Sequence, residues 1–269
     1  MFCGKRRLAA RPHAAKPNAM KPLKDLTEYL DEFLRTASVS DYSQAMNGLH
    51  LENQGSVSRI AAAVDACEAV IAEACARRAD LLIVHHGLFW NASTITKGVY
   101  RKLKLATGSN LAVYSSHLPL DVHPVVGNNV ILAKALGLKR LRPFLPVRGQ
   151  MAGLQGEFSG SIADLAARTG KAVGGGVQVC AGGPSKPKRV GVVTGGAGSE
   201  VAAAAAAGVD TFVTGEGPHW SYTLAEELGI NVIYAGHYAT ETFGVKALAQ
   251  HLSVRFRLPW SFIDHPTGL

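Results

Sequence analysis

Two adjacent histidines follow a run of four apolar residues in the stretch LLIVHHGLFW, at positions 81 to 90. Further along the chain, His117 is followed four residues later by Asp121, and His237 is followed four residues later by Glu241. Imidazole and carboxylate groups together are the usual ligands of Zn, Fe, Mn, Co or Ni ions in proteins. These residue types therefore indicate a bound divalent metal, although a single histidine at a strand end is more often a hydrogen-bonded structural residue.

The adjacent pair His85 and His86 poses a geometric question, because neighbouring side chains on a regular strand point to opposite faces. We expect the strand to turn into a loop here, a turn that Gly87 permits. The two imidazoles would then diverge, and each would serve a different ion. A bridging carboxylate can hold two such ions about 3.5–4 Å apart. His237 and Glu241 face the same side of a helix if that helix begins at His237.

The elements that must position these side chains alternate along the chain. In the first half, we expect strands at 59–66, 81–86 and 111–117, and helices at 24–35, 67–79, 99–106 and 127–138. In the second half, we expect strands at 189–196, 211–216 and 231–237, and helices at 199–207, 219–228 and 239–252. This alternation predicts an α/β fold with parallel sheets. Ligands of such sheets gather at the carboxyl ends of the strands, where all the candidate residues stand.

The chain divides into four predicted parts. Residues 1–19 are a basic disordered tail, 20–140 an N-terminal α/β lobe, 141–188 a connecting or capping segment, and 189–269 a C-terminal α/β lobe that completes the metal site. The segment 141–188 is rich in Gly and Pro, with mixed short strands and one helix expected near 161–169. The third strand of each lobe ends in Tyr-x-x-His, as YSSH and YAGH. This match indicates two similar βαβ-type lobes.

Composition narrows the class of protein. The apolar fraction of 47% is ordinary for a soluble globular chain. No window of about 18 consecutive apolar residues predicts a membrane span, and the N-terminus lacks the apolar stretch of a secretory signal. The four cysteines form no CxxC pair, which fits a reducing compartment without structural disulfides. We therefore expect a cytoplasmic protein without a membrane partner.

The net charge of +8 comes largely from the tail. Five Lys and Arg residues and no acid precede Met20, so the rest of the chain carries 8 − 5 = +3. A basic tail of this kind is typical of disordered extensions. It could be a transit peptide, a nucleic-acid-binding arm or a dispensable extension, and we expect no specific nucleic-acid binding by the folded part.

Several segments carry a resemblance to a known family. HHGLFW, HLPLDVHPVVGNN, VTGEGPHW and GHYATETFGVKAL resemble signature segments of the Nif-three-like family, whose members are often labelled GTP cyclohydrolase 1 type 2 homologues. The resemblance spans about residues 22–265. It implies a two-lobed α/β subunit of the Nif-three-like fold and a toroidal homohexamer, a trimer of dimers, around dinuclear metal centres.

The resemblance also implies a ligand set. The five ligands of the family fall on His85, His86, Asp121, His237 and Glu241. It implies that His86 and Asp121 hold one ion, that His85 and His237 hold the other, and that Glu241 bridges them. The chain departs from the family in the extra Ala-Met of DYSQAMNGLHLE and in Tyr238, where a histidine is frequent.

Two functions remain open from the sequence. The first is a metal-dependent hydrolase of a small nucleotide-like or cyclic substrate, in which two ions activate a water molecule. His117, His123 and Glu216 are candidate catalytic residues that could move a proton or orient a ligand. The second is a non-catalytic metal-binding scaffold or metal-handling protein. The segment VVTGGAGSE could hold a phosphate or only form a tight strand-to-helix turn.

Overall fold

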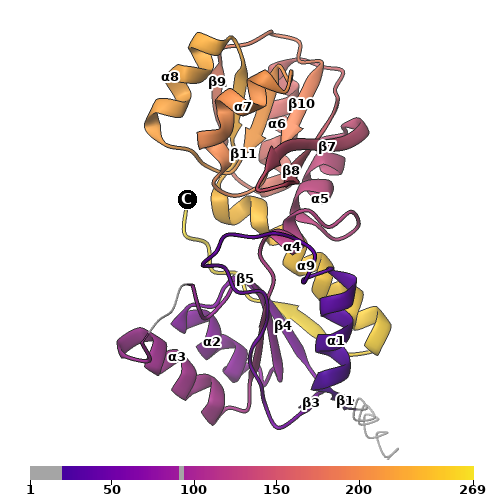
Figure 1. The fold of residues 1–269 in the computed structure, drawn as a ribbon, viewed down its shortest axis with the longest axis vertical. Helices are drawn as coiled ribbons and strands as arrows, with labels where there is room; N and C mark the ends of the chain where they lie inside the picture. The colour runs from indigo at the N-terminus through magenta and orange to yellow at the C-terminus, as the bar shows by residue number, and fades with distance from the viewer. Residues whose placement is uncertain (1–19, 91–93) are drawn as a thin grey trace, which may run out of the picture.

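Two α/β lobes, one above the other in Figure 1, make up the chain in the computed structural model, which describes residues 20–90 and 94–269. The predicted basic tail at 1–19 lies outside the described residues. Among the helices of the described ranges, none combines the length and the hydropathy that crossing a bilayer requires.

The first lobe is built on a five-stranded sheet with the order β13-β4-β5-β6-β2. Its strands are β2 (Gly48–Leu51), β4 (Ile60–Asp65), β5 (Leu81–His86), β6 (Ala112–Ser115) and β13 (Trp260–Phe262). All neighbours are parallel except β2, which runs antiparallel to β6. A short antiparallel pair, β1 (Lys21–Pro22) and β3 (Ser56–Val57), lies beside it.

Helices cover both faces of this sheet. α1 (Leu23–Phe33) and α9 (His237–Phe256) pack on one face, and α2 (Glu68–Ala76) and α3 (Lys97–Gly108) pack on the other. Leu81 and Ile83 of β5 belong to the first core, and Leu82 and Val84 belong to the second. The strand is apolar up to its two terminal histidines because both of its faces are buried.

The second lobe has a six-stranded sheet with the order β7-β8-β10-β11-β12-β9. Its strands are β7 (Lys139–Val147), β8 (Gln150–Glu157), β9 (Gln178–Ala181), β10 (Arg189–Val192), β11 (Thr211–Thr214) and β12 (Asn231–Tyr234). Its helices are α5 (Asn128–Ala135), α6 (Ile162–Val173), the 3₁₀ turn η1 (Ala197–Glu200), α7 (Val201–Ala206) and α8 (His219–Leu228). The parallel strands β10, β11 and β12 form its centre.

The segment 141–188 differs from the expectation that it connects or caps the lobes. It supplies most of β7 and all of β8 and β9, which extend the second sheet antiparallel at both edges. Gly153 serves strand pairing, since a Cβ there would lie 2.4 Å from the carbonyl oxygen of Val192 on β10. At Gly153, glycine is therefore required by close backbone approach.

Two further segments differ from the elements that the sequence predicted. β2 lies in a stretch for which we predicted neither a strand nor a helix, and α4 (Leu118–Asp121) adds a short helix after β6. The end of the chain returns to the first lobe, because most of α9 and all of β13 pack there. The predicted C-terminal lobe at 189–269 is therefore shared between the two sheets.

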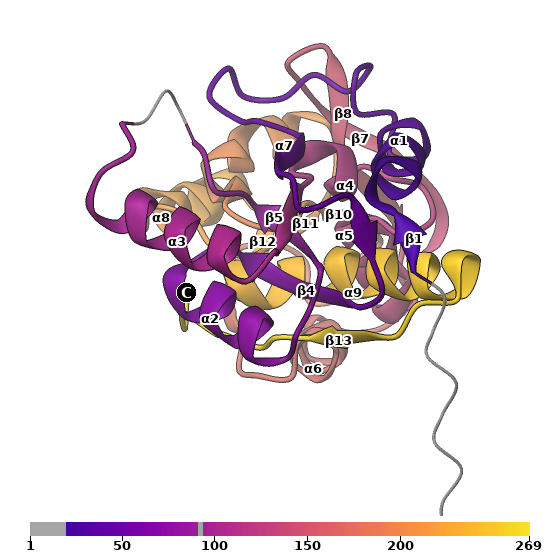
Figure 2. The ribbon, with the colours of Figure 1, turned by 90° about the horizontal axis from the view of Figure 1, so that it is seen from below.

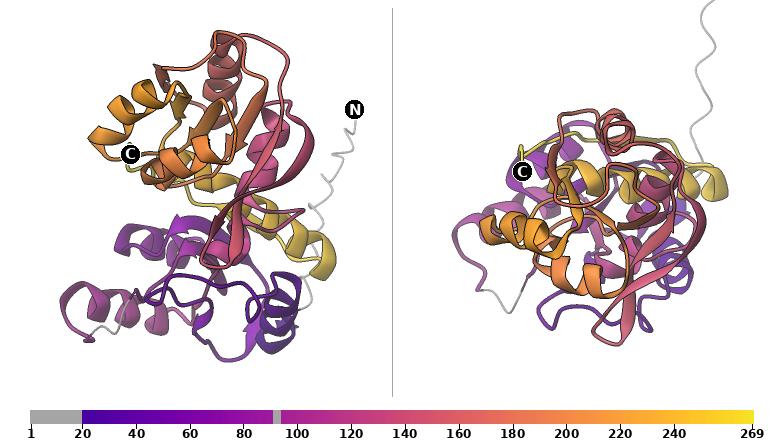
Figure 3. Two further views of the ribbon diagram at one scale, coloured as in Figure 1. Left: turned by 45° about the horizontal axis from the view of Figure 1, so that its top comes forward. Right: turned by 90° about the horizontal axis from the view of Figure 1, so that it is seen from above.

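Helix α9 ties the two lobes together. It starts at the junction between them and runs alongside β4 and β13 (Figure 1, Figure 2). Midway along it, the Gly244 backbone N–H donates to Oδ1 of Asn128 at the start of α5, at 2.6 Å. The long hairpin of β7 and β8 makes a second link (Figure 3), since the Gln150 amide donates to the Ser40 carbonyl in the first lobe.

Gly244 offers a test of this junction. A Cβ there would lie 2.9 Å from both Asn128 Oδ1 and Leu120 Cγ. An alanine in a helix interior usually stabilises a protein by up to about 1 kcal/mol, but Gly244→Ala should destabilise this one by about 1–3 kcal/mol through overpacking. Urea denaturation measures the difference. Gly98→Ala in α3, where the nearest atom is a flexible Arg101 nitrogen at 3.9 Å, is the control and should be neutral or stabilising. Equal stabilisation by both would contradict a tight junction.

Candidate metal centre

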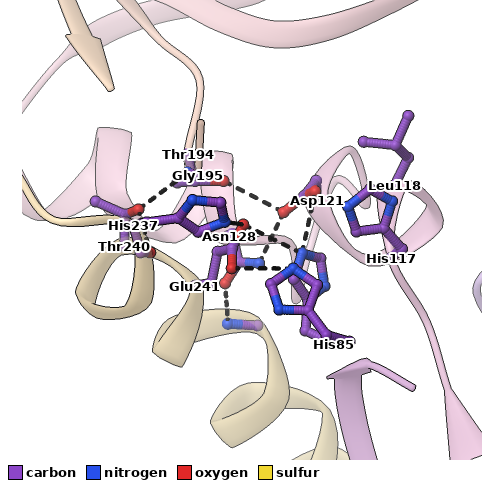
Figure 4. A network of polar contacts seen from close by, with 12 residues as sticks. His85, His117, Leu118, Asp121, Asn128, Thr194, Gly195, His237, Thr240 and Glu241 are labelled. Atoms are coloured by element: carbon purple, nitrogen blue, oxygen red, sulfur yellow. Dashed lines mark hydrogen bonds and ion pairs between the residues drawn. The ribbon is translucent and has the colours of Figure 1, made fainter. Parts of the chain in front are cut away.

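The carboxyl ends of the parallel strands in both sheets face one another at the lobe junction. His85 and His86 end β5, and His117 follows two residues after β6. Asp121 ends α4, and His237 begins α9 directly after the loop that follows β12. Figure 4 shows the imidazoles of His85 and His237 converging on the carboxylate of Glu241.

Glu241 lies at the centre of this arrangement and is only 3% exposed. Its Oε1 is 3.4 Å from His85 Nε2 and 3.1 Å from His237 Nε2. Its Oε2 is 3.5 Å from His86 Nε2. Asp121 Oδ2 is 3.4 Å from His85 Nε2. The structure therefore brings together all five side chains that the sequence indicated as ligands.

The imidazoles share one orientation, with Nδ1 held by an acceptor and Nε2 directed into the site. The acceptors are the Ser116 carbonyl for His85 at 2.9 Å, Asp65 for His86 at 2.8 Å, Glu216 for His237 at 2.8 Å and Asp41 for His117 at 2.9 Å. An acceptor on Nδ1 fixes the tautomer that leaves a lone pair on Nε2. This is the usual arrangement of metal-ligating histidines, and the acceptors orient the rings.

Two buried polar atoms point to a cation. Within the described residues, His85 Nε2 and Glu241 Oε2 are buried without a hydrogen-bond partner. Buried polar atoms are nearly always paired, and a bound ion is one of the recognised reasons for an exception. One group of possible ligand atoms within 4.8 Å of one another comprises His86, His237 and Glu241. The donor set therefore fits a divalent metal.

The carboxylate of Asp121 is positioned by polar neighbours from the second lobe. Its Oδ1 accepts from Asn128 Nδ2 at 2.8 Å and from Thr194 Oγ1 at 3.2 Å. These bonds leave Oδ2 directed at His85 (Figure 4). Asp121 belongs to a segment of the first lobe, but the position of its carboxylate depends on Thr194, which follows β10 in the second lobe.

Gly195 makes room for the central carboxylate. Its φ is +71°, and a Cβ there would lie 2.3 Å from Glu241 Oε1. The glycine in VVTGGAGSE therefore serves both the turn after β10 and the close approach of Glu241.

The geometry of the histidine pair differs from the expected loop. Both residues belong to β5, and their rings lie 4.8 Å apart at 48° to each other. Gly87 is not in the left-handed region. It is required instead because a Cβ there would lie 2.1 Å from the His50 ring. Both imidazoles reach the site because β5 ends at the lobe junction. The site extends around the end of the strand, so side chains from either face can contact it.

The pKa values of the site residues reflect burial opposed by hydrogen bonds and neighbouring charges. Burial alone lowers the pKa of His237, but the hydrogen bonds and charges of Glu241 and Glu216 raise it to about 9. Burial likewise opposes the charged form of His85, yet the carboxylates of Asp121 and Glu241 raise its pKa well above the usual value. Burial raises the pKa of Glu241, and the surrounding histidines outweigh it and lower that pKa. The raised pKa values of His85 and His237 therefore favour their protonated forms beside the Glu241 carboxylate when no cation is bound.

The three candidate catalytic residues have different positions. The His117 ligand nitrogen lies within 4.8 Å of those of His85 and His86, so His117 faces the site. Glu216 orients His237 through Nδ1. His123 is not among the residues that line the site.

His123 is a structural residue. Its Nε2 donates to the Phe33 carbonyl at 3.0 Å, and its Nδ1 accepts the Val125 and Val126 N–H groups at 3.2 Å. Both ring nitrogens are thus used in holding the turn after α4. The expectation that His123 faces the site is wrong.

Tyr238, the departure noted beside a candidate ligand, points away from the site. Its hydroxyl donates to Asp264 Oδ1 at 2.9 Å and accepts the His265 N–H at 2.7 Å. It anchors the C-terminal segment near the start of α9. Asp41 and Asp65, which orient His117 and His86, were not identified from the sequence.

Comparison with known proteins places the chain among relatives of similar length. The family model described as Duf34/NIF3 (NGG1p interacting factor 3) matches residues 21–267. A "GTP cyclohydrolase 1 type 2 homolog" from Deinococcus radiodurans is 42% identical over 248 residues, covering 91% of this chain and 94% of the relative. A protein of the same name from Pyrococcus abyssi is 44% identical over 251 residues, covering 91% and 98%.

Solved structures share the fold. TTHA1606 from Thermus thermophilus has a TM-score of 0.85 at 41% identity, over 93% of this chain and 100% of that one. Reduced HcgD from Methanocaldococcus jannaschii has a TM-score of 0.82 at 26% identity, over 92% and 100%.

The raised imidazole pKa values predict proton release on metal binding. With a pKa of about 9, His237 is protonated at about pH 7.5 in the metal-free protein, and an ion requires the neutral ring. Zinc binding should therefore release protons, and the apparent affinity should rise from about pH 7 to 9. Calorimetry in buffers of different ionisation enthalpy measures the number released. Glu216→Gln removes one source of the raised pKa and should reduce the release at about pH 8. Zinc binding without proton release would contradict this account.

Proposed function

The chain belongs to the Duf34/NIF3 (NGG1p interacting factor 3) family, and from that premise we propose that it binds two divalent metal ions and uses them to hydrolyse a small substrate. The observation that carries the proposal is the buried Glu241 carboxylate, whose two oxygens face different imidazoles. A carboxylate in this position suits a bridge between two ions. Zn, Fe, Mn, Co and Ni all suit the donor set.

The proposed ligands are His85, His86, Asp121, His237 and Glu241. Family resemblance assigns His86 and Asp121 to one ion and His85 and His237 to the other. The contacts of Glu241 support the second assignment, since Oε1 lies near both His85 and His237. Asp121 Oδ2 lies 3.4 Å from His85 Nε2, so its assignment beside His86 would require a shift of the carboxylate.

The chemistry follows from the metals and from one further histidine. When bound, two divalent ions supply Lewis-acid activation of a water molecule and of the bond to be broken. His117 presents its Nε2 lone pair beside the ligands, because its Nδ1–H donates to Asp41 at 2.9 Å. We assign His117 the role of accepting a proton from the attacking water and passing it to the leaving group.

The proposal also covers the substrate class, the cellular compartment and the oligomeric state. The name of the relatives from Deinococcus radiodurans and Pyrococcus abyssi points to a nucleotide-like or cyclic substrate. We place the protein in the cytoplasm as a toroidal homohexamer, a trimer of dimers. The alternative is a metal-binding scaffold or metal-handling protein, which the same buried ligand set would also suit.

Metal stoichiometry tests the bridge. Elemental analysis of the loaded protein should give two ions per subunit, and Glu241→Gln, which keeps the side-chain volume, should weaken the retention of both by at least tenfold. His219→Ala on the exposed start of α8 is the matched control and should retain both. Circular dichroism checks that each variant is folded. One ion in the fully loaded protein, or loss of only one ion in the Glu241 variant, would contradict the proposed bridge.

Turnover separates the enzyme from the scaffold. A panel of amide, cyclic amidine and phosphoester substrates should reveal a hydrolysis that His85→Ala abolishes. His117→Ala should lower the rate about 10²–10⁴-fold, as loss of a general base does, while retaining both ions. His219→Ala should leave the rate unchanged. Metal transfer to an apo-protein without hydrolysis of any substrate would favour the scaffold.

The assembly is tested by mass. Light scattering in physiological salt should give about six times 28.4 kDa, or roughly 170 kDa, because the resemblance implies a ring of six. A ring that encloses the sites would restrict access by folded proteins and duplex nucleic acid. A stable monomer that retains both ions would contradict the hexamer and remove this size restriction.

A further inference from the structure

The candidate metal centre opens into a cavity of about 490 Å³ between the lobes. Its floor is formed by the imidazoles and carboxylates already described. Its walls are mostly apolar and come from both lobes: Leu118, Leu145, Val147, Val193 and Ala197. Tyr42 and Trp90 also line it, and each is 38% exposed. The volume lies within the range of small-molecule sites.

The ionisable groups of the wall limit the charge of a ligand. The cavity is lined by three histidines, His86, His117 and His237, and by three acids, Asp121, Glu200 and Glu241. Among its described lining residues there is neither a lysine nor an arginine. The guanidinium of Arg148 instead stacks over the Tyr42 ring, 4.5 Å from its centroid.

Bound metals do not supply enough charge for a polyphosphate. Two divalent ions bring four positive charges, and the carboxylates of Asp121 and Glu241 offset two, which leaves about +2 in the floor. Glu200 in the wall reduces the attraction for anions further. Sites for chains of phosphates normally add arginine forks or lysines. This cavity therefore suits a ligand that carries at most one negative group near the metals.

The aromatic side chains favour a flat ligand. Trp90 stands edge-on to His117, with ring centroids 5.0 Å apart and planes at 86°. It also lies 6.5 Å from Tyr42, whose ring is partly covered by Arg148. Trp90 thus offers an aromatic surface in the cavity that a ligand can cover. Aromatic side chains bind planar rings by stacking and edge contacts.

We propose that the cavity takes a planar heterocyclic substrate without phosphate, whose ring lies against Trp90 with the bond to be hydrolysed at the metal centre. This inference rests on the proposed function and narrows its substrate from the nucleotide-like or cyclic compounds to an unphosphorylated heterocycle. The apolar walls contact the body of the ring, and the site imidazoles and ions contact its polar edge.

Matched ligand pairs test the inference. The probes are guanosine, adenosine, uridine and cytidine, each beside its 5′-triphosphate, with the full chain loaded with zinc. Equilibrium dialysis gives the dissociation constants, and elemental analysis gives the zinc content before and after. At least one nucleoside should bind with a Kd below about 1 mM. The corresponding 5′-triphosphate should bind less than tenfold more tightly than that nucleoside. Trp90→Ala should weaken the nucleoside at least tenfold, and Trp220→Ala, an exposed tryptophan of α8 outside the cavity, should leave it unchanged.

Three outcomes would overturn the inference. They are a triphosphate that binds ten times tighter than its nucleoside, the absence of any nucleoside binding below about 1 mM, and equal affinity in Trp90→Ala and the unaltered chain. Each outcome is measured on protein that still holds two zinc ions, so none of these outcomes contradicts the proposed metal centre. A chain that cannot hold two zinc ions would contradict the proposed function itself.

Discussion

The burial of Glu241 is the constraint on which the rest of the structure depends. A carboxylate that is 3% exposed at the junction of two lobes would be costly without compensating charge. The compensation comes from three imidazoles, contributed by the end of β5 and by the first turn of α9. Without a cation, the charge is offset by His85 and His237, whose pKa values are raised, and metal ions offset it in the proposed loaded state. The same side chain therefore links the stability of the junction to the occupancy of the site.

The fold explains how one carboxylate reaches ligands from both lobes. Parallel strands of the two sheets end at the same junction, and the matching Tyr-x-x-His segments place His117 and His237 on opposite sides of it. Helix α9 begins there and then packs in the first lobe, so Glu241 is fixed by the contacts of both sheets. Gly195 and Gly244 mark the two places where this packing leaves no room for a Cβ.

The sequence predicted most of the parallel strands and the candidate side chains at their ends, because these positions follow from local rules, and the family resemblance selected the five ligands among them. Apolar runs mark buried strands, and polar residues after them mark the carboxyl edge. Asp41 escaped prediction because it lies in a segment without such a pattern and reaches His117 across 76 positions. Asp65 stands at the end of the expected strand at 59–66, but its contact with His86, 21 positions away, depends on the pairing of β4 with β5. His123 was wrongly placed, since only the fold shows that both of its ring nitrogens bond to backbone. Short strands were expected in 141–188, but their place in the second sheet was not predicted, because the pairing of β8 with β10 joins segments far apart in the chain.

Anomalous diffraction from metal-loaded crystals tests the central claim most directly, because it locates each ion relative to Glu241. The account predicts two peaks about 3.5–4 Å apart, with Oε1 of Glu241 bound to the ion beside His85 and His237 and Oε2 bound to the ion beside His86. A single peak, or two peaks with both Glu241 oxygens bound to the same ion, would contradict it.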